Sequence, residues 1–197
     1  MRFRGSAILF VLLLLGGIAP FDVSGGAGKP PENSQALPNP SAVVKPTAYV
    51  SLVPVPRGKE FQIAIVAEIA RGFHMNSHKP SDQYLIPTSV TAQLPAGIQL
   101  RDTIYPDGRL EKFSFSPNKP LDVYTGTVTF RLRLAAGNDA AIGATTIPIT
   151  LRYQACNDTT CLQPVKVPVE VRLEVASSGA KSRAVHPEVF SAANSPH

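Results

Sequence analysis

Hydrophobic and polar residues alternate along several stretches of the chain between residues 47 and 175. The clearest alternation runs through residues 125–134, 146–155 and 165–175. The apolar members of these stretches are Val128, Phe130, Leu132, Leu134, Ile147, Ile149, Leu151, Tyr153, Val165, Val167, Val169, Val171, Leu173 and Val175. A period of two residues predicts strands with one face on a core and the other in water. Residues 61–70, FQIAIVAEIA, are apolar on both faces, which predicts a central strand.

Turn-forming Pro, Gly and Asn residues separate these short stretches, and no amphipathic helix pattern appears between them. This arrangement is typical of an all-β protein, and we predict an immunoglobulin-like antiparallel β-sandwich over residues 47–175. Residues 25–46 are rich in Pro and Gly and predict a flexible linker. Residues 176–197 show no periodicity and predict a flexible tail.

The first residues, MRFRGSAILFVLLLLGGIAP, combine a basic start with an apolar run of about a dozen residues. A run of this length fits the core of a signal peptide, because a membrane-spanning helix needs roughly 20 apolar residues. We therefore predict a signal peptide over residues 1–24, with an uncleaved N-terminal anchor in the inner membrane as the alternative. Either way the domain is expected to be exported, to the periplasm, where a disulfide can persist.

Charge and composition narrow the class of partner. The formal net charge is +5, and the basic residues are spread singly along the strands, without the basic run and interleaved aromatics of a nucleic-acid-binding surface. We expect no nucleic-acid partner, no small-molecule substrate and no cofactor.

The only two cysteines, Cys156 and Cys161, flank the residues NDTT in the stretch YQACNDTTCLQP. Turn formers between two strands predict a β-hairpin, and opposed residues of a hairpin are close enough for a disulfide. The pair could be a structural staple, two ligands of a metal, or a redox pair. A disulfide that closes a loop of about six residues stabilises the folded state by only roughly 2 kcal/mol, which argues against a purely structural role. Zinc is disfavoured because two further ligands in the usual paired spacing are missing.

The residue numbering around the hairpin contains a conflict. If Cys156 faces Cys161, odd residues face even ones, yet the inward residues are odd on both strands, as at Tyr153 and Val165. A strict two-residue period cannot satisfy both conditions. We therefore predict a β-bulge or register break at residues 162–164, where Pro164 lacks a backbone donor.

A second notable stretch, GFHMNSHKPSDQYLIPTSVTAQLP, spans residues 72–95 and contains His74 and His78. The simpler interpretation is a polar loop in which His74 makes a hydrogen bond to the backbone. The alternative is a metal carrier that uses His74, Met75, His78 and the cysteines as soft ligands.

Together, GFHMNSHKPSDQYLIPTSV and, about 70 residues later, YQACNDTTCLQPVKVPVEV resemble the N-terminal periplasmic domain of the thiol:disulfide interchange protein DsbD, also called the disulfide bond corrector domain family. The most specific part is Tyr-x-x-Cys…Cys-x-x-Pro leading into an alternating strand. Some well-known members have five residues between the cysteines, whereas this chain has four.

The resemblance implies that Cys156 and Cys161 shuttle electrons, with Cys161 forming mixed disulfides and Cys156 resolving them. It implies an aromatic cap over the pair, for which Phe113 and Phe115 are the candidates, and site neighbours at Tyr153, His74 and Pro164, with no metal. The implied partners are a membrane electron-transfer protein, expected here on another polypeptide, and thioredoxin-like periplasmic proteins. The activity would be that of a protein-disulfide reductase or interchange component. The alternative function is a non-catalytic immunoglobulin-like binding or assembly module with a structural disulfide.

Overall fold

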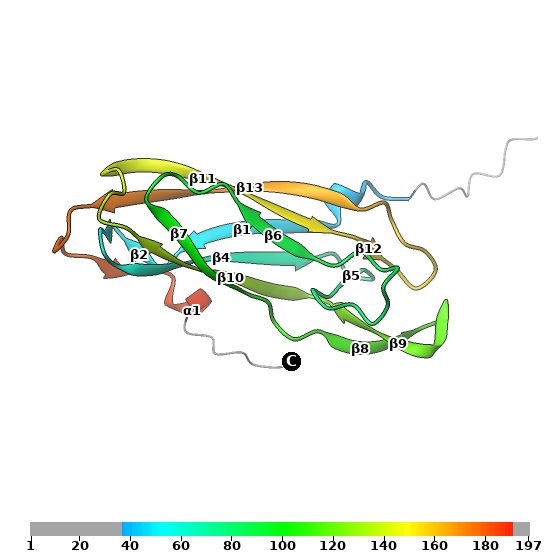
Figure 1. Ribbon diagram of the computed structural model, residues 1–197. Helices are drawn as coiled ribbons and strands as arrows, with labels where there is room; N and C mark the ends of the chain where they lie inside the picture. Colours follow the sequence, from blue (N-terminus) through cyan, green and yellow to red (C-terminus); the bar gives the residue numbers. More distant parts are fainter. Residues whose placement is uncertain (1–36, 191–197) are drawn as a thin grey trace, which may run out of the picture. The chain divides into compact units, whose positions relative to one another are not determined.

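The computed structural model describes residues 37–190, which form a β-sandwich with a smaller sheet at one end (Figure 1). The predicted signal peptide, most of the predicted linker and residues 191–197 lie outside the described residues. In residues 37–190, no helix has the length and apolar character needed to cross a membrane.

Two four-stranded sheets pack face to face. The first has the order β1 (Val44–Val50), β4 (Glu60–Ile69), β10 (Thr127–Ala136) and β7 (Ile98–Ile104). The second has the order β3 (Val55–Pro56), β13 (Val165–Ala176), β11 (Gly143–Tyr153) and β6 (Ser89–Ala92). All pairs within them are antiparallel except β3 with β13. The architecture is the immunoglobulin-like sandwich that the alternation predicted.

The burial pattern follows the sequence pattern. In β11 the buried side chains are every second one from Ile147 to Tyr153, and these close onto Phe130, Leu132 and Leu134 of the opposite sheet in one hydrophobic cluster. The strand at residues 61–70 is central as predicted, because β4 lies between β1 and β10. Burying side chains such as these contributes about 1.5–3 kcal/mol each to folding.

A third sheet lies at the end of the sandwich where β11 and β13 meet the cysteine hairpin (Figure 1). Its strands are short or extend beyond the sandwich, in the order β12 (Ala155–Cys156), β5 (His74–Asn76), β9 (Ser116–Tyr124) and β8 (Arg109–Phe113). It has a small apolar cluster of its own, formed by Phe113, Leu121 and Val123 with Leu85 packed against them. This sheet brings the second conspicuous stretch of the sequence beside the cysteines.

The two ends of the described chain pack closer to the sandwich than their composition suggested. A 3-10 turn (Pro40–Ala42) precedes β1, and the Tyr153 hydroxyl donates to the Pro40 carbonyl at 2.8 Å. Where we predicted a flexible tail, β14 (Arg183–Ala184) pairs with β2 (Leu52–Val53), and a short helix, α1 (Pro187–Phe190), follows. The guanidinium of Arg131 donates to the Val189 carbonyl at 3.0 Å. This hydrogen bond and the β14–β2 pairing are long-range contacts that hold the segment and leave no periodicity in the sequence.

Candidate functional site: the cysteine hairpin and its cap

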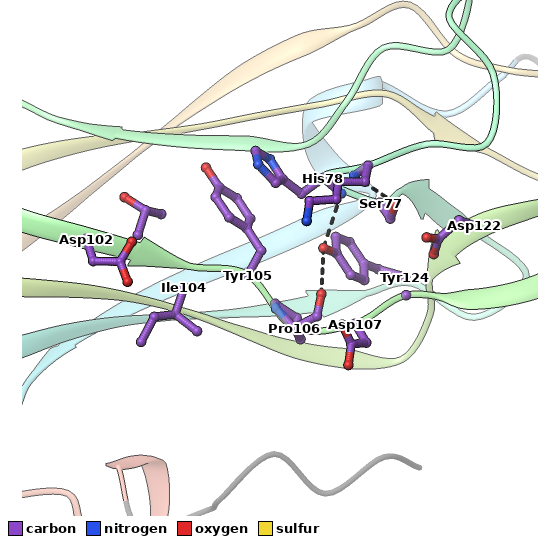
Figure 2. A pocket seen from close by; sticks show the side chains of 12 residues that line it. Ser77, His78, Asp102, Ile104, Tyr105, Pro106, Asp107, Asp122 and Tyr124 are labelled. Atoms are coloured by element: carbon purple, nitrogen blue, oxygen red, sulfur yellow. Dashed lines mark hydrogen bonds between the residues drawn. The ribbon is translucent and has the colours of Figure 1, made fainter.

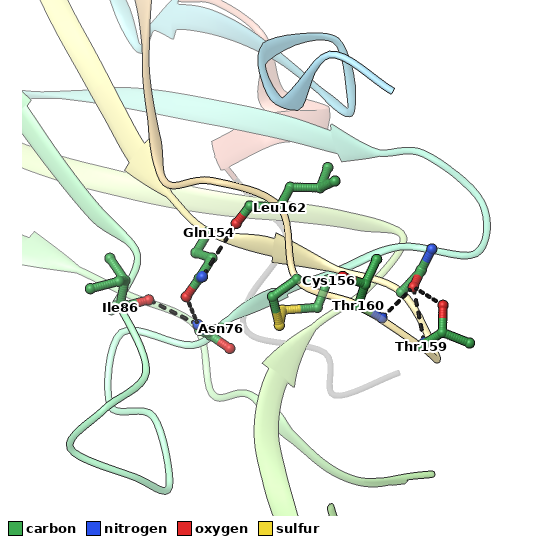
Figure 3. Close-up of a disulfide and its surroundings, with 9 residues drawn as sticks. Asn76, Ile86, Gln154, Cys156, Thr159, Thr160 and Leu162 are labelled. Atoms are coloured by element: carbon green, nitrogen blue, oxygen red, sulfur yellow. Dashed lines mark hydrogen bonds between the residues drawn. A yellow bond between two sulfur atoms is a disulfide. The ribbon is translucent and has the colours of Figure 1, made fainter. Parts of the chain in front are cut away.

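The two cysteines close a disulfide across a tight turn (Figure 3). Cys156 and Cys161 form an isolated antiparallel bridge, with 4.0 Å between their Cα atoms and a bond between their sulfurs. The backbone N–H of Asn157 donates to the Thr160 carbonyl at 2.9 Å. The Asn157 side-chain oxygen accepts from the backbone N–H groups of Thr159 and Thr160 at 3.0 and 2.9 Å. This turn is therefore held by its own polar residues as well as by the disulfide.

The predicted register break is present. The β11–β13 ladder ends with Tyr153 opposite Val165, and the next antiparallel pair is Cys156 opposite Cys161. Residues 154 and 155 on one strand therefore lie opposite the three residues 162–164 on the other. The Leu162 N–H already donates to the Ala155 carbonyl at 2.8 Å, so the extra residue falls at Gln163 or Pro164. The prediction is confirmed, and the break turns the hairpin away from the main ladder.

The two cysteines differ in exposure. Cys156 is buried, with 1% of its surface accessible, whereas Cys161 is exposed. Because exchange begins with a thiolate that reaches a disulfide sulfur, this asymmetry makes the two positions chemically inequivalent. Tyr153, the last residue of β11, is fully buried at the base of the hairpin. Pro164 is exposed at the register break.

His74 lies beside the buried cysteine. Strand β12 pairs with β5, and in that pairing Cys156 is directly opposite His74. His74 is only 3% exposed. Its Nε2 has no hydrogen-bond partner among residues 37–190. Burial lowers the pKa of His74 to about 4, against a smaller opposing effect of the Asp158 carboxylate. The structure thus places His74, an expected site neighbour, opposite Cys156. The expected backbone hydrogen bond is not made by its Nε2 within residues 37–190.

Both candidate cap residues stand over His74. The Phe113 ring stacks on the imidazole with 4.0 Å between ring centroids, and the Phe115 centroid lies 6.5 Å from it. Phe113 is 8% exposed and is held in the small cluster of the third sheet, whereas Phe115 is 42% exposed. The β8–β9 hairpin that carries them is tied to the cysteine turn, because the Ser114 hydroxyl donates to the Asp158 carbonyl. Phe113 is therefore the inner and Phe115 the outer ring of this cap.

An open pocket of about 490 Å³ adjoins this arrangement. His74 and Phe113 line it together with three charged residues, Arg71, Glu111 and Asp158. The pocket lets solvent approach the rim of the cap while the imidazole itself stays covered.

His78 belongs to a different environment. Its ring stacks on Tyr105 with 3.6 Å between the ring centroids (Figure 2). Its Nδ1 lies 3.1 Å from the Thr88 carbonyl oxygen. Its backbone N–H donates to the Tyr124 hydroxyl, and that hydroxyl donates to the Pro106 carbonyl. Burial raises the pKa of Tyr124 to about 12, so the hydroxyl keeps its proton. Among residues 37–190, no three His, Cys, Asp or Glu side chains are grouped so as to hold a metal. The rings of His74 and His78 lie in separate environments, stacked on Phe113 and Tyr105 respectively.

Some residues of the site carry no signal in the sequence. Asn76 is fully buried, and its amide nitrogen donates to the Ile86 carbonyl at 3.1 Å and to the Gln154 side chain at 3.3 Å (Figure 3). Gln154 in turn donates to the Leu162 carbonyl at 3.2 Å. These two amides connect the register break to β5. They therefore also fix the position of His74, on β5, relative to that of Cys156. Isolated amides of this kind are found only once the strands are placed.

No curated protein sequence matches this chain. Among solved structures, the chain is similar to the N-terminal domain of Neisseria meningitidis DsbD in the reduced form, with 18% identity, a TM-score of 0.43, and coverage of 75% of this chain and 94% of that one. It is also similar to the N-terminal periplasmic domain of Proteus mirabilis ScsB, with 12% identity, a TM-score of 0.45, and coverage of 74% of this chain and 51% of that one. The profile of the family described as "Thiol:disulfide interchange protein DsbD, N-terminal" matches residues 41–173, and the chain belongs to this family.

Proposed function

We propose that this domain passes reducing equivalents between a membrane electron donor and exported proteins, through reversible opening of the Cys156–Cys161 disulfide. The observation that carries the proposal is the disulfide between an exposed Cys161 and a buried Cys156. An exposed sulfur can receive a partner, and a buried sulfur directly across the turn can displace it. Membership of a thiol:disulfide interchange family supports the same chemistry.

The exchange has two balanced steps in each direction. When the domain is reduced, a donor thiolate attacks the Cys161 sulfur, a mixed disulfide forms, and Cys156 leaves as a thiolate. The second donor thiol then attacks the donor sulfur of the mixed disulfide and releases Cys161 as a thiolate. When the domain reduces a substrate, the Cys161 thiolate attacks the substrate disulfide, and Cys156 then attacks the Cys161 sulfur. Two electrons move each time, and the pair ends as two thiols or as one disulfide.

The cap gives this chemistry selectivity. Phe113 must leave its cluster, and the Ser114–Asp158 hydrogen bond must break, before a protein partner can approach the buried side of the pair. A protein partner can replace these contacts with its own and open the cap, whereas a small thiol reaches the exposed Cys161 without replacing them. We infer that thioredoxin-like proteins of the periplasm, acting as donor or acceptor, are such partners, and that the N-terminal segment directs export or anchors the domain to the inner membrane.

A trapping experiment tests the proposal. In a Cys156→Ser variant the exposed Cys161 stays free, so a mixed disulfide with a partner cannot be resolved. We expect the full chain carrying this change to form a covalent complex with an oxidised thioredoxin-like domain, visible on a non-reducing gel and lost with dithiothreitol. The matched Cys161→Ser variant should form none. Equal trapping by both variants, or by neither, would contradict the assigned roles.

A further inference from the structure

His74 lies directly opposite Cys156, the buried cysteine of the pair. Because Cys156 and His74 are directly opposed across the β12–β5 pairing, their side chains leave the same face of the sheet. Opposed residues have Cβ atoms about 4.5–5.5 Å apart, which lets a cysteine sulfur and an imidazole nitrogen come within hydrogen-bonding reach. The other ring contacts of His74 are the phenyl groups of Phe113 and Phe115, which accept no proton.

The unpaired Nε2 of His74 needs a physical explanation. Buried polar atoms are nearly always hydrogen-bonded, and this nitrogen has no partner among residues 37–190, so a water, an ion or a catalytic role has to account for it. In the disulfide state Cys156 has no proton to share, so its sulfur leaves the imidazole unsatisfied. Once the disulfide opens, Cys156 becomes a thiol, and the imidazole gains a possible donor directly across the strand pair.

We propose that His74 takes the proton from the Cys156 thiol when Cys156 attacks a mixed disulfide at Cys161, and returns it when the pair is reduced. The inference rests on the exchange function proposed above. In the step, the S–H bond of Cys156 breaks and its proton goes to the imidazole. The Cys156–Cys161 bond forms, the bond from Cys161 to the partner sulfur breaks, and the partner leaves as a thiolate. In this step the imidazole would take the proton directly from the reacting thiol, which would make His74 a catalytic residue.

The charge state of the imidazole suits this role. Burial keeps its pKa near 4, so in neutral solution the ring is neutral and has a free lone pair. When Phe113 moves away, water reaches the ring and the pKa rises toward the ordinary value of about 6.5, which makes the imidazole a stronger base. The charged residues around the ring are Asp158 of the cysteine turn, Glu111 of β8 and Arg71 before β5. Of these, the Asp158 carboxylate favours the protonated ring. Opening the cap would thus expose the pair and strengthen its base together.

Ellman's reagent separates the two steps of the reaction. The reduced full chain releases one thionitrobenzoate when Cys161 attacks the reagent and a second when Cys156 resolves the mixed disulfide. We expect His74→Phe and His74→Gln to leave the first release within about twofold of wild type and to slow the second by about tenfold or more, since general-base assistance contributes typically 10²–10⁴-fold. The pH profile of the second release should lose the inflection due to the imidazole and follow only the ionisation of the thiol.

The two substitutions distinguish chemistry from packing. Phenylalanine keeps a ring to stack on Phe113 but has no nitrogen, so a packing role would be rescued by His74→Phe and not by His74→Gln. His78→Phe, in the neighbouring pocket, is the matched control and should leave both releases unchanged. A second release with wild-type rate and pH profile in both His74 variants, or rescue by His74→Phe, would overturn the role of His74. Release of only one equivalent by the wild type would instead overturn the exchange function, and the role of His74 with it.

Discussion

Reduction of Cys156–Cys161 should weaken the fold only slightly. The disulfide joins residues five apart in the sequence, and in the chain-entropy model a loop of about six residues stabilises the folded state by about 2 kcal/mol. The hairpin has other supports that do not depend on the bridge, namely the Asn157 turn and the hydrogen bond from Leu162 to Ala155. A free thiol at the buried Cys156 also packs as a small apolar group. The proposed exchange function would need this tolerance, because the domain would alternate between two redox states.

Urea unfolding of the oxidised and the dithiothreitol-reduced full chain measures the difference. We expect both forms to unfold cooperatively with similar slopes, and the reduced form to be less stable by about 2 kcal/mol. The double variant Cys156→Ser/Cys161→Ser is the control for thiol chemistry. A loss of about 4 kcal/mol or more on reduction, or loss of cooperative unfolding, would refute the reasoning and identify the bridge as a staple of the fold.

Three further predictions concern the cap, the core and the imidazole. Phe113→Ala removes the inner ring of the cap, whose burial is worth about 1.5–3 kcal/mol, and should speed reduction of the disulfide by dithiothreitol about tenfold. Phe115→Ala removes the exposed outer ring and should change this rate less than threefold. Equal effects of the two substitutions would contradict a role of the buried ring as a gate. Phe130→Ala should lower the free energy of unfolding by about 3–5 kcal/mol in a chemical denaturation experiment, without changing the Ellman's reagent kinetics of the protein that remains folded. Folding lowers the pKa of His74, so the folded state binds fewer protons than the unfolded state, and the free energy of unfolding should fall as the pH drops from about 6.5 toward 4. His74→Gln should flatten this part of the stability profile. An unchanged profile in the variant would show that the imidazole is not buried in solution.

The sandwich could be predicted from the sequence because its strands are long and one face of each is buried. Ile147, Ile149 and Leu151 alternate with polar residues, so the period alone reveals the strand and its inward face. The same parity argument predicted the register break, since two odd-numbered inward sets cannot meet across an even-to-odd cysteine pair. These inferences needed only local periodicity and the geometry of a pleated strand.

The surroundings of the cysteines could not be predicted in the same way. The strands that bring His74 opposite Cys156 are three and two residues long, too short for any period to emerge. The hydrogen bonds through Asn76 and Gln154, and the pairing of β14 with β2, join residues far apart in the chain and depend on the finished fold. The aromatic cap was expected from the family resemblance, and the order of its two rings, with Phe113 inside and Phe115 outside, emerged only from the structure.

The central claim is that the Cys156–Cys161 pair exists to be opened and closed, and its reduction potential tests this most directly. Equilibration of the full chain with defined ratios of oxidised and reduced glutathione or dithiothreitol, followed by alkylation of free thiols, gives the fraction reduced at each potential. We predict a midpoint above about −300 mV, within the range in which protein partners exchange disulfides. A midpoint far below about −300 mV, typical of inert structural disulfides, would contradict the account.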